Sequence, residues 1–169
     1  MIGDDTKYEY WRTAFPKLQS VGFEKTSSKT SEYNCIAHAV GTNDRWWSDA
    51  ESEDEGYYWP IDRVESRIGQ VEELEAALAH EGFVKCDSTR VEPGYEKVAI
   101  YVKDDNRWEH AARQLNDGRW STKDGVNADF SHATLECVCP HYGRVYCYMK
   151  RVVAAAAVSP APTVLISAP

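Results

Sequence analysis

Apolar side chains recur every three or four positions in two stretches of the first half of the chain. Residues 71–81 carry such a stripe, have acidic residues in their early turns and are followed by a glycine, which predicts a helix that packs on a core. A shorter helix is expected to begin near Cys35 and to end at Gly41, with Ser31 or Asn34 as its N-cap. The first half of the chain is therefore predicted to supply the helices.

The second half of the chain consists of short runs rich in β-forming residues, separated by turn sequences. The turn at residues 116–118, Asn-Asp-Gly, is typical of a β-hairpin, so the runs on both sides of it are expected to be antiparallel neighbours. The runs predicted as strands are residues 97–103, 108–115, 119–123 and 143–151. Helices followed by hairpin-connected strands predict an α+β fold, with N-terminal helices packed on an antiparallel β-sheet.

The length of 169 residues suits one domain with a sizeable core. We expect this single domain to span residues 1–151. Residues 152–169 are rich in alanine and proline and carry no charge, which predicts a flexible C-terminal tail. Residues 42–63 are aromatic and acidic without a regular period, and we expect them to form a long loop that covers part of the domain.

Acidic residues outnumber basic ones, 27 against 19, and leave a net charge of −8 at pH 7. Nucleic acids and anionic membranes bind positively charged surfaces. The composition therefore argues against both as partners and favours a protein or peptide substrate. The N-terminal residues lack the succession of a signal peptide and no apolar run reaches the length of a membrane span, from which we expect a cytoplasmic protein. No motif requires a cofactor, and the sequence leaves the oligomeric state open.

The candidate chemistry is a cysteine nucleophile with a histidine base. The five cysteines follow no disulfide pattern, so reduced thiols are expected. Cys35 falls in the first turn of its predicted helix, where free backbone N–H groups and the helix dipole favour a thiolate and could hold an oxyanion. His110 falls on a predicted strand, and an imidazole beside the thiol would act as its base.

The predicted hairpin suggests a third member of this site. A three-residue loop at 116–118 would pair Leu115 with Arg119 and place His110 opposite Asp124. Directly opposed residues have Cβ atoms roughly 4.5–5.5 Å apart, close enough for the Asp124 carboxylate to orient the imidazole. A shift of this register by one residue would remove Asp124 from that position.

The order of these residues is similar to that of the transglutaminase-like branch of the papain-like cysteine enzymes, with a cysteine on a helix, a histidine on a strand and an aspartate after the next hairpin. The chain resembles more closely a family of small bacterial proteins of unknown function. The motifs that match this family are Tyr33-Asn34-Cys35, Trp46-Trp47, Tyr58-Trp59-Pro60, the run from His110 to Gln114, and Gly118-Arg119-Trp120. The resemblance to the cysteine enzymes implies a papain-like or transglutaminase-like fold and a triad of Cys, His and Asp or Asn that acts on acyl groups.

The bacterial family also bears on the third member of the triad. Its position that matches Asp124 is often apolar, which leaves open whether Asp124 or a second carboxylate orients His110. Asp129 is that rival, because the acidic residue followed by His132 belongs to the same family pattern. The resemblance implies no particular substrate.

The expected function is that of a thiol-dependent hydrolase or acyltransferase, a cysteine peptidase or amidase or a transglutaminase-like enzyme. In this hypothesis His110 deprotonates Cys35, the thiolate attacks a peptide, isopeptide or carboxamide carbonyl, and water or an amine resolves the acyl-thioester. The alternative is a non-catalytic protein-binding module of the same fold, of the inhibitor or immunity type. In that case Cys35 is a small core residue and His110 a hydrogen-bonded sheet histidine.

A structural zinc site is the remaining alternative. Cys35 and His38 are three residues apart on a predicted helix. A five-residue segment far downstream holds three further residues of types that bind zinc. These downstream residues are Cys137, Cys139 and His141. Neither half has the spacing of a zinc knuckle, and the single residue between the two downstream thiols suits a strand instead.

Overall fold

The computed structural model describes residues 9–153. Of the predicted tail, residues 152–169, all but the first two lie outside the described residues. The helices are α1 (Glu9–Ala14), α2 (Leu18–Val21), α3 (Cys35–Val40) and α4 (Val71–His80), with 3₁₀ turns η2 (Glu53–Glu55), η3 (Glu65–Arg67) and η4 (Leu135–Val138). The strands are β1 (Phe23–Lys25), β2 (Trp46–Trp47), β3 (Tyr57–Tyr58), β4 (Val84–Cys86), β5 (Tyr95–Val102), β6 (Trp108–Gln114), β7 (Trp120–Lys123), β8 (Asp129–His132) and β9 (Arg144–Val152).

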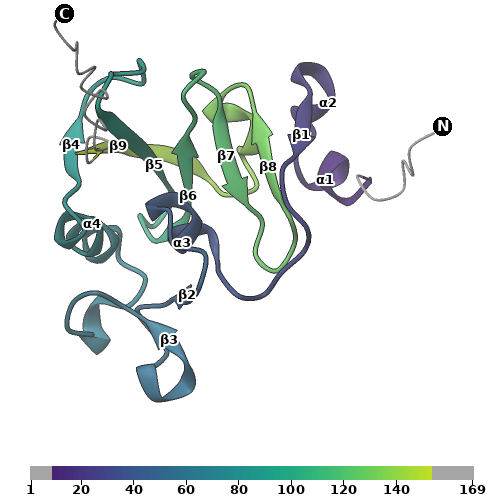
Figure 1. The fold of residues 1–169 in the computed structure, drawn as a ribbon. Helices are drawn as coiled ribbons and strands as arrows, with labels where there is room; N and C mark the ends of the chain where they lie inside the picture. Colours follow the sequence, from purple (N-terminus) through teal and green to yellow (C-terminus); the bar gives the residue numbers. More distant parts are fainter. Residues whose placement is uncertain (1–8, 154–169) are drawn as a thin grey trace, which may run out of the picture.

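Seven of the strands form one antiparallel sheet, in the order β1-β8-β7-β6-β5-β9-β4, and helices lie on both sides of it (Figure 1). The α+β prediction with an antiparallel sheet is therefore confirmed at this level. Both predicted helices are present, as α3 and α4, and the four predicted strands correspond to β5, β6, β7 and β9. The predicted covering loop, residues 42–63, contains the short parallel pair β2 and β3 and the turn η2.

Sequence patterning missed the two strands at one edge of the sheet, β8 and β1. All four residues of β8 are buried, and they alternate between polar and aromatic side chains, because Asp129 and Ser131 face one side while Phe130 and His132 face the other. A strand buried on both faces normally reads as a continuous apolar run, and this one does not. The polar side chains of β8 face α3, and Asp129 is buried there because it contacts polar side chains between the sheet and this helix.

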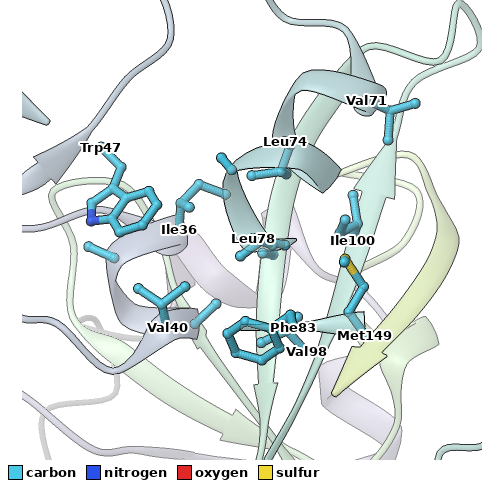
Figure 2. Packing of buried hydrophobic residues seen from close by; sticks show 14 of the residues in the cluster. Ile36, Val40, Trp47, Val71, Leu74, Leu78, Phe83, Val98, Ile100 and Met149 are labelled. Atoms are coloured by element: carbon cyan, nitrogen blue, oxygen red, sulfur yellow. The ribbon is translucent and has the colours of Figure 1, made fainter. Parts of the chain in front are cut away.

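The larger core cluster lies between the sheet and the pair α3 and α4 (Figure 2). Leu74 and Leu78 of α4 pack toward Val98 and Ile100 of β5, and each of the four side chains is fully buried. The predicted apolar stripe of the 71–81 helix is the face that makes these contacts. Burial of a Leu or Ile side chain stabilises the fold by roughly 1.5–3 kcal/mol, so this layer holds α3 and α4 in place.

The second cluster covers the opposite face of the sheet. It joins Trp11 of α1 and Leu18 of α2 to Tyr101 of β5, Phe130 of β8 and the turn η4. The Trp11 and Phe130 rings have centroids 4.7 Å apart. The sheet is therefore the central layer, with α3 and α4 on one face and α1, α2 and η4 on the other. Among the described residues, no helix is long and apolar enough to cross a membrane.

The first cluster gives a direct stability prediction. Replacing the fully buried Leu78 by alanine removes apolar contacts and leaves a cavity, and we expect the free energy of unfolding to fall by about 2–5 kcal/mol. Urea denaturation followed by circular dichroism measures this loss. Val84→Ala is the matched control, because Val84 is 60% exposed on β4 and its truncation should change the unfolding free energy by no more than about 0.5 kcal/mol. Equal effects of the two substitutions would contradict the described packing.

Candidate functional site

Asn34 fixes the start of α3. Its Oδ1 accepts hydrogen bonds from the backbone N–H of Ala37 (3.3 Å) and of Trp47 (3.2 Å), while its Nδ2 donates to the Trp47 carbonyl (2.7 Å). The first of these bonds is an N-cap, and the other two attach the helix start to β2. Of the two predicted N-cap candidates, Ser31 and Asn34, the structure uses Asn34. Cys35 lies in the first turn of α3, as predicted.

The Cys35 side chain lies between α3 and β6. It is partly buried, packs against the larger core cluster, and its sulfur lies near the backbone N–H of Ala111. Burial raises the pKa of the Cys35 thiol to about 11, although hydrogen bonds from backbone N–H groups and the nearby charge of Lys123 act in the opposite direction. The resting thiol is thus neutral at pH 7, and a thiolate forms only when a base removes its proton.

The His110 imidazole lies on the other face of the sheet. Its Nε2 is 3.3 Å from the Thr122 hydroxyl, and its ring stacks on that of Tyr142 with centroids 3.9 Å apart. The opposing residue on β5, Tyr101, belongs to the second core cluster. Burial lowers the pKa of His110 well below its usual value, and the neighbouring histidines, His132 among them, add to this effect. His110 is therefore neutral at pH 7.

The structure does not bring the Cys35 thiol and the His110 imidazole together. Successive side chains of a strand point to opposite faces, so His110 and Ala111 leave β6 in opposite directions. Cys35 reaches the backbone of Ala111 from the face of α3, whereas His110 packs on the face of η4. The two residues are thus neighbours across one strand, with the sheet between their side chains.

The hairpin between β6 and β7 has the predicted register. Arg113 pairs with Ser121, and the backbone N–H of Leu115 donates to the carbonyl of Arg119 (2.8 Å). The ladder pairing between β6 and β7 ends at the first of these pairs, before it reaches His110. Sequence reasoning therefore had the loop right, but the strands are not paired where the histidine lies.

Asp124 follows β7 and points to the same face as His110, but its partners are other residues. Its Oδ2 accepts from Trp11 Nε1 (2.9 Å) and Asn127 Nδ2 (3.1 Å), and its Oδ1 accepts from the Tyr142 hydroxyl (2.8 Å). Tyr142 is the residue whose ring stacks on His110. Asp124 thus reaches the histidine only through this tyrosine, and it anchors α1 to the end of β7.

Asp129 contacts a different histidine, His38 of α3. The distance from His38 Nδ1 to Asp129 Oδ2 is 3.5 Å, and the same carboxylate oxygen accepts a hydrogen bond from the Tyr33 hydroxyl (2.9 Å). The other ring nitrogen, Nε2, is 2.8 Å from the Ser121 hydroxyl. We refer to His38, Ser121, Asp129 and Tyr33 as the His38 cluster. It lies between α3 and the sheet, on the same face as Cys35.

The His38 imidazole is neutral at pH 7. Burial lowers its pKa, the Asp129 carboxylate acts in the opposite direction, and the charges of Arg113 and Lys123 lower it further. A neutral ring carries one N–H, and the Asp129 carboxylate can only accept, so the proton belongs on Nδ1. Nε2 is then the acceptor of the Ser121 hydroxyl proton.

Lys123 holds the loop that leads into α3. The residue is fully buried, and its Nζ donates to the backbone carbonyls of Thr30, Gly125 and Asn127. It also lies 5.1 Å from the centre of the Tyr33 ring, within range of a cation–π contact. Three carbonyl acceptors satisfy all three N–H groups of the ammonium, so this buried cation positions the backbone before Tyr33.

Sequence reasoning had considered His38 only as a metal ligand. Its helical position indicated a sheet-facing side chain, but its hydroxyl partner lies 83 residues away in the chain, and no local pattern connects the two. The zinc alternative finds no support, since residues 9–153 contain no group of three or more His, Cys, Asp or Glu that could hold a metal ion. Cys137 belongs to the core cluster on the opposite face from Cys35.

A family model for a domain of unknown function, DUF7689, matches residues 24–150, and the chain belongs to this family. The matched range contains the His38 cluster, His110 and Cys35, together with all the strands of the sheet except the first residue of β1 and the last two residues of β9. No curated protein and no solved structure matches the chain. The papain-like and transglutaminase-like resemblance therefore stays a prediction.

The buried histidines make the fold sensitive to acid. Burial lowers the pKa of His132 from 6.5 to about 4, so below pH 6.5 the unfolded chain takes up a proton that the folded protein does not. The contribution of this residue to the free energy of unfolding is fully present above pH 6.5 and is lost as the pH falls toward 4. The shift corresponds to about 3 kcal/mol, and the lowered pKa values of His38 and His110 act in the same direction.

We therefore expect the free energy of unfolding to decrease steadily between pH 7 and pH 4.5, as measured by urea denaturation at fixed ionic strength. Replacing His132 by glutamine should reduce the slope of this decrease, because one of the protonation sites is removed. His80→Gln is the matched control, since His80 is exposed on the last turn of α4. If the His132 variant and the parent protein lose stability in parallel, the described burial of this imidazole is contradicted.

Proposed function

We propose that the protein is a thiol-dependent hydrolase or acyltransferase that acts on a peptide, isopeptide or carboxamide bond, with Cys35 as its nucleophile. The observation that supports this role is the place of the sulfur. Cys35 lies in the first turn of a capped helix, it is reduced and partly exposed, and its sulfur lies near the backbone N–H of Ala111, the residue that follows His110. A cysteine in the first turn of a helix, with backbone N–H groups near its sulfur, is placed to hold the oxyanion that forms when the sulfur attacks a carbonyl carbon.

In this proposal both reacting groups start neutral. The thiol proton passes to a histidine as the sulfur attacks the carbonyl carbon, the amine or ammonia leaves with that proton, and an acyl-thioester forms on Cys35. Water or a second amine then resolves the thioester. His110 is neutral, but its ring packs against Thr122 and Tyr142 on the opposite face of the sheet, so it can accept the proton only after β6 rearranges and turns the ring toward Cys35.

The non-catalytic protein-binding module is the second candidate function, and one observation favours it. The thiol pKa is raised to about 11 and the His110 ring is directed to the opposite face, so the resting protein holds no thiolate–imidazolium pair. In this case the acidic surface and the aromatic segment around β2 and β3 would contact a partner protein. An inhibitor or an immunity-type protein is the kind of module that we propose for this alternative.

Alkylation by iodoacetamide at pH 7.5 distinguishes the two candidates, with the labelled cysteines located by peptide mass spectrometry. Cys147 provides an internal reference, because it is also partly buried and burial raises its pKa to about 12. If a base assists Cys35, its labelling should be at least about 100-fold faster than that of Cys147 and should fall to the reference rate in His110→Gln. His80→Gln is the control for loss of an exposed imidazole.

Equal slow labelling of Cys35 and Cys147 in the parent protein would overturn the enzyme proposal and leave the binding module as the proposed function. Fast labelling of Cys35 that persists in His110→Gln would keep the nucleophile and remove His110 as its base. Circular dichroism and thermal unfolding of each variant separate these results from loss of the fold.

A further inference from the structure

A hydroxyl, an imidazole and a carboxylate are arranged in sequence between α3 and the sheet. The Ser121 Oγ is 2.8 Å from His38 Nε2, and His38 Nδ1 is 3.5 Å from Asp129 Oδ2. The three side chains come from a helix and two neighbouring strands, so the tertiary structure alone assembles them. This order of groups, with one ring nitrogen toward a hydroxyl and the other toward a carboxylate, is that of a serine nucleophile with its base.

The register of β7 and β8 explains this placement. Ser121 lies directly opposite Ser131, and Lys123 lies directly opposite Asp129. All four side chains leave the sheet on the face of α3, and the His38 ring spans the diagonal from Ser121 to Asp129. The ring is thus fixed at both nitrogens.

The resting protonation state of the ring suits a general base. His38 is neutral for the reasons given above, with Nδ1–H directed to Asp129 and Nε2 free to take the hydroxyl proton. A positive charge that develops on the ring would be stabilised by the Asp129 carboxylate. One oxygen of this carboxylate, Oδ1, is buried and has no hydrogen-bond partner among the described residues, although Asp129 is only 6% exposed. A polar group that enters the site would find this acceptor available.

We propose that Ser121 is an acyl-accepting nucleophile, activated by His38 and oriented through it by Asp129, and that it forms a second reactive site that does not require Cys35. The Ser121 hydroxyl proton passes to His38 Nε2 as Oγ bonds to the carbonyl carbon of an ester. The bond from that carbon to the leaving oxygen breaks, the leaving alcohol takes the proton from Nε2, and an ester on Ser121 remains. Water repeats the two steps and releases a carboxylic acid.

The burial of the site defines the substrate class. Ser121 is 5% exposed, and the Tyr33 ring stacks over His38 with centroids 6.2 Å apart. A charged or bulky acyl group would lose its hydration or clash with these residues, so the site fits a short, uncharged ester. Ser131 offers an internal comparison, because it is an equally buried hydroxyl on the same face, directly opposite Ser121, but its Oγ has no partner in residues 9–153.

The test uses 4-nitrophenyl acetate with the full-length protein at pH 7.5, and peptide mass spectrometry locates the acetyl group. We expect acetylation of Ser121 and not of Ser131, at a rate that falls by about 100-fold or more in His38→Gln. Asp129→Asn should slow the reaction while keeping the volume of the side chain, and Ser131→Ala should acetylate as the parent protein does. Acetylation should rise with pH below pH 6.5, as the fraction of neutral His38 increases, and should level off above it, because the pKa of His38 is lowered from 6.5.

Two outcomes would overturn this inference. One is the absence of an acetyl group on Ser121 in a folded protein, and the other is the same rate of Ser121 acetylation with and without the His38 imidazole. His132→Gln serves as a control for the removal of a buried histidine from the opposite face. Melting temperatures identify any variant that has lost its fold, and Asp129→Asn then provides an independent measure of the same relay.

The result for Ser121 is separate from that for Cys35. An acetyl-thioester on Cys35 is cleaved by neutral hydroxylamine, whereas an acetyl ester on Ser121 resists it at the same pH. The Cys35→Ala variant should keep its Ser121 acetylation, since the two groups use different bases in our proposals. Failure of the cysteine proposal and failure of the serine proposal therefore give different mass-spectrometric patterns.

Discussion

Successive side chains of a β-strand leave opposite faces of the sheet, and the buried polar groups of this protein are arranged by that constraint. On β7, Ser121 and Lys123 face α3, while Thr122 faces His110 and His132 on the other side. One strand of four residues thus serves two polar networks that have no side chain in common. Because the central layer is shared, each network is fixed in position by the packing of both core clusters.

Burial decides the protonation states in both networks. His38, His110 and His132 all have lowered pKa values because the surrounding layers exclude water from the charged form. Lys123 is a fully buried cation at this end of the sheet. Its ammonium group donates its hydrogen bonds to backbone carbonyls rather than to a carboxylate. The His38 cluster thus holds a neutral imidazole between a hydroxyl and a carboxylate, an arrangement that suits proton transfer from the hydroxyl to the ring.

The cysteine and serine proposals place chemistry on the same face of the sheet, at the two ends of the contact between α3 and the strands. Cys35 lies over β6 at the start of the helix, and His38 lies one turn later over β7 and β8. Their environments differ in one decisive respect. The serine has a hydrogen-bonded base in the resting structure, whereas the cysteine has greater exposure and a raised pKa.

The sequence by itself determined the elements that local patterns encode. The stripe of α4, the N-cap and glycine stop of α3, and the turn of the β6–β7 hairpin all follow from side-chain spacing and turn chemistry, and the structure has them. The positions of Cys35 in a first helical turn and of His110 on a strand follow in the same way. The alternating polar strand β8 could not be recognised, because its polar side chains are buried only through partners elsewhere in the chain.

The tertiary structure decided which of these residues meet. Strand periodicity states that His110 and Ala111 face opposite sides, but only the packing of α3 shows which side the cysteine occupies. Asp124 was the first candidate in the sequence and Asp129 the alternative; in the structure Asp124 anchors α1 through Trp11, and Asp129 contacts His38. These pairings join residues that are 83 or more positions apart, and contacts of that range depend on how layers stack, which no local pattern of the chain records.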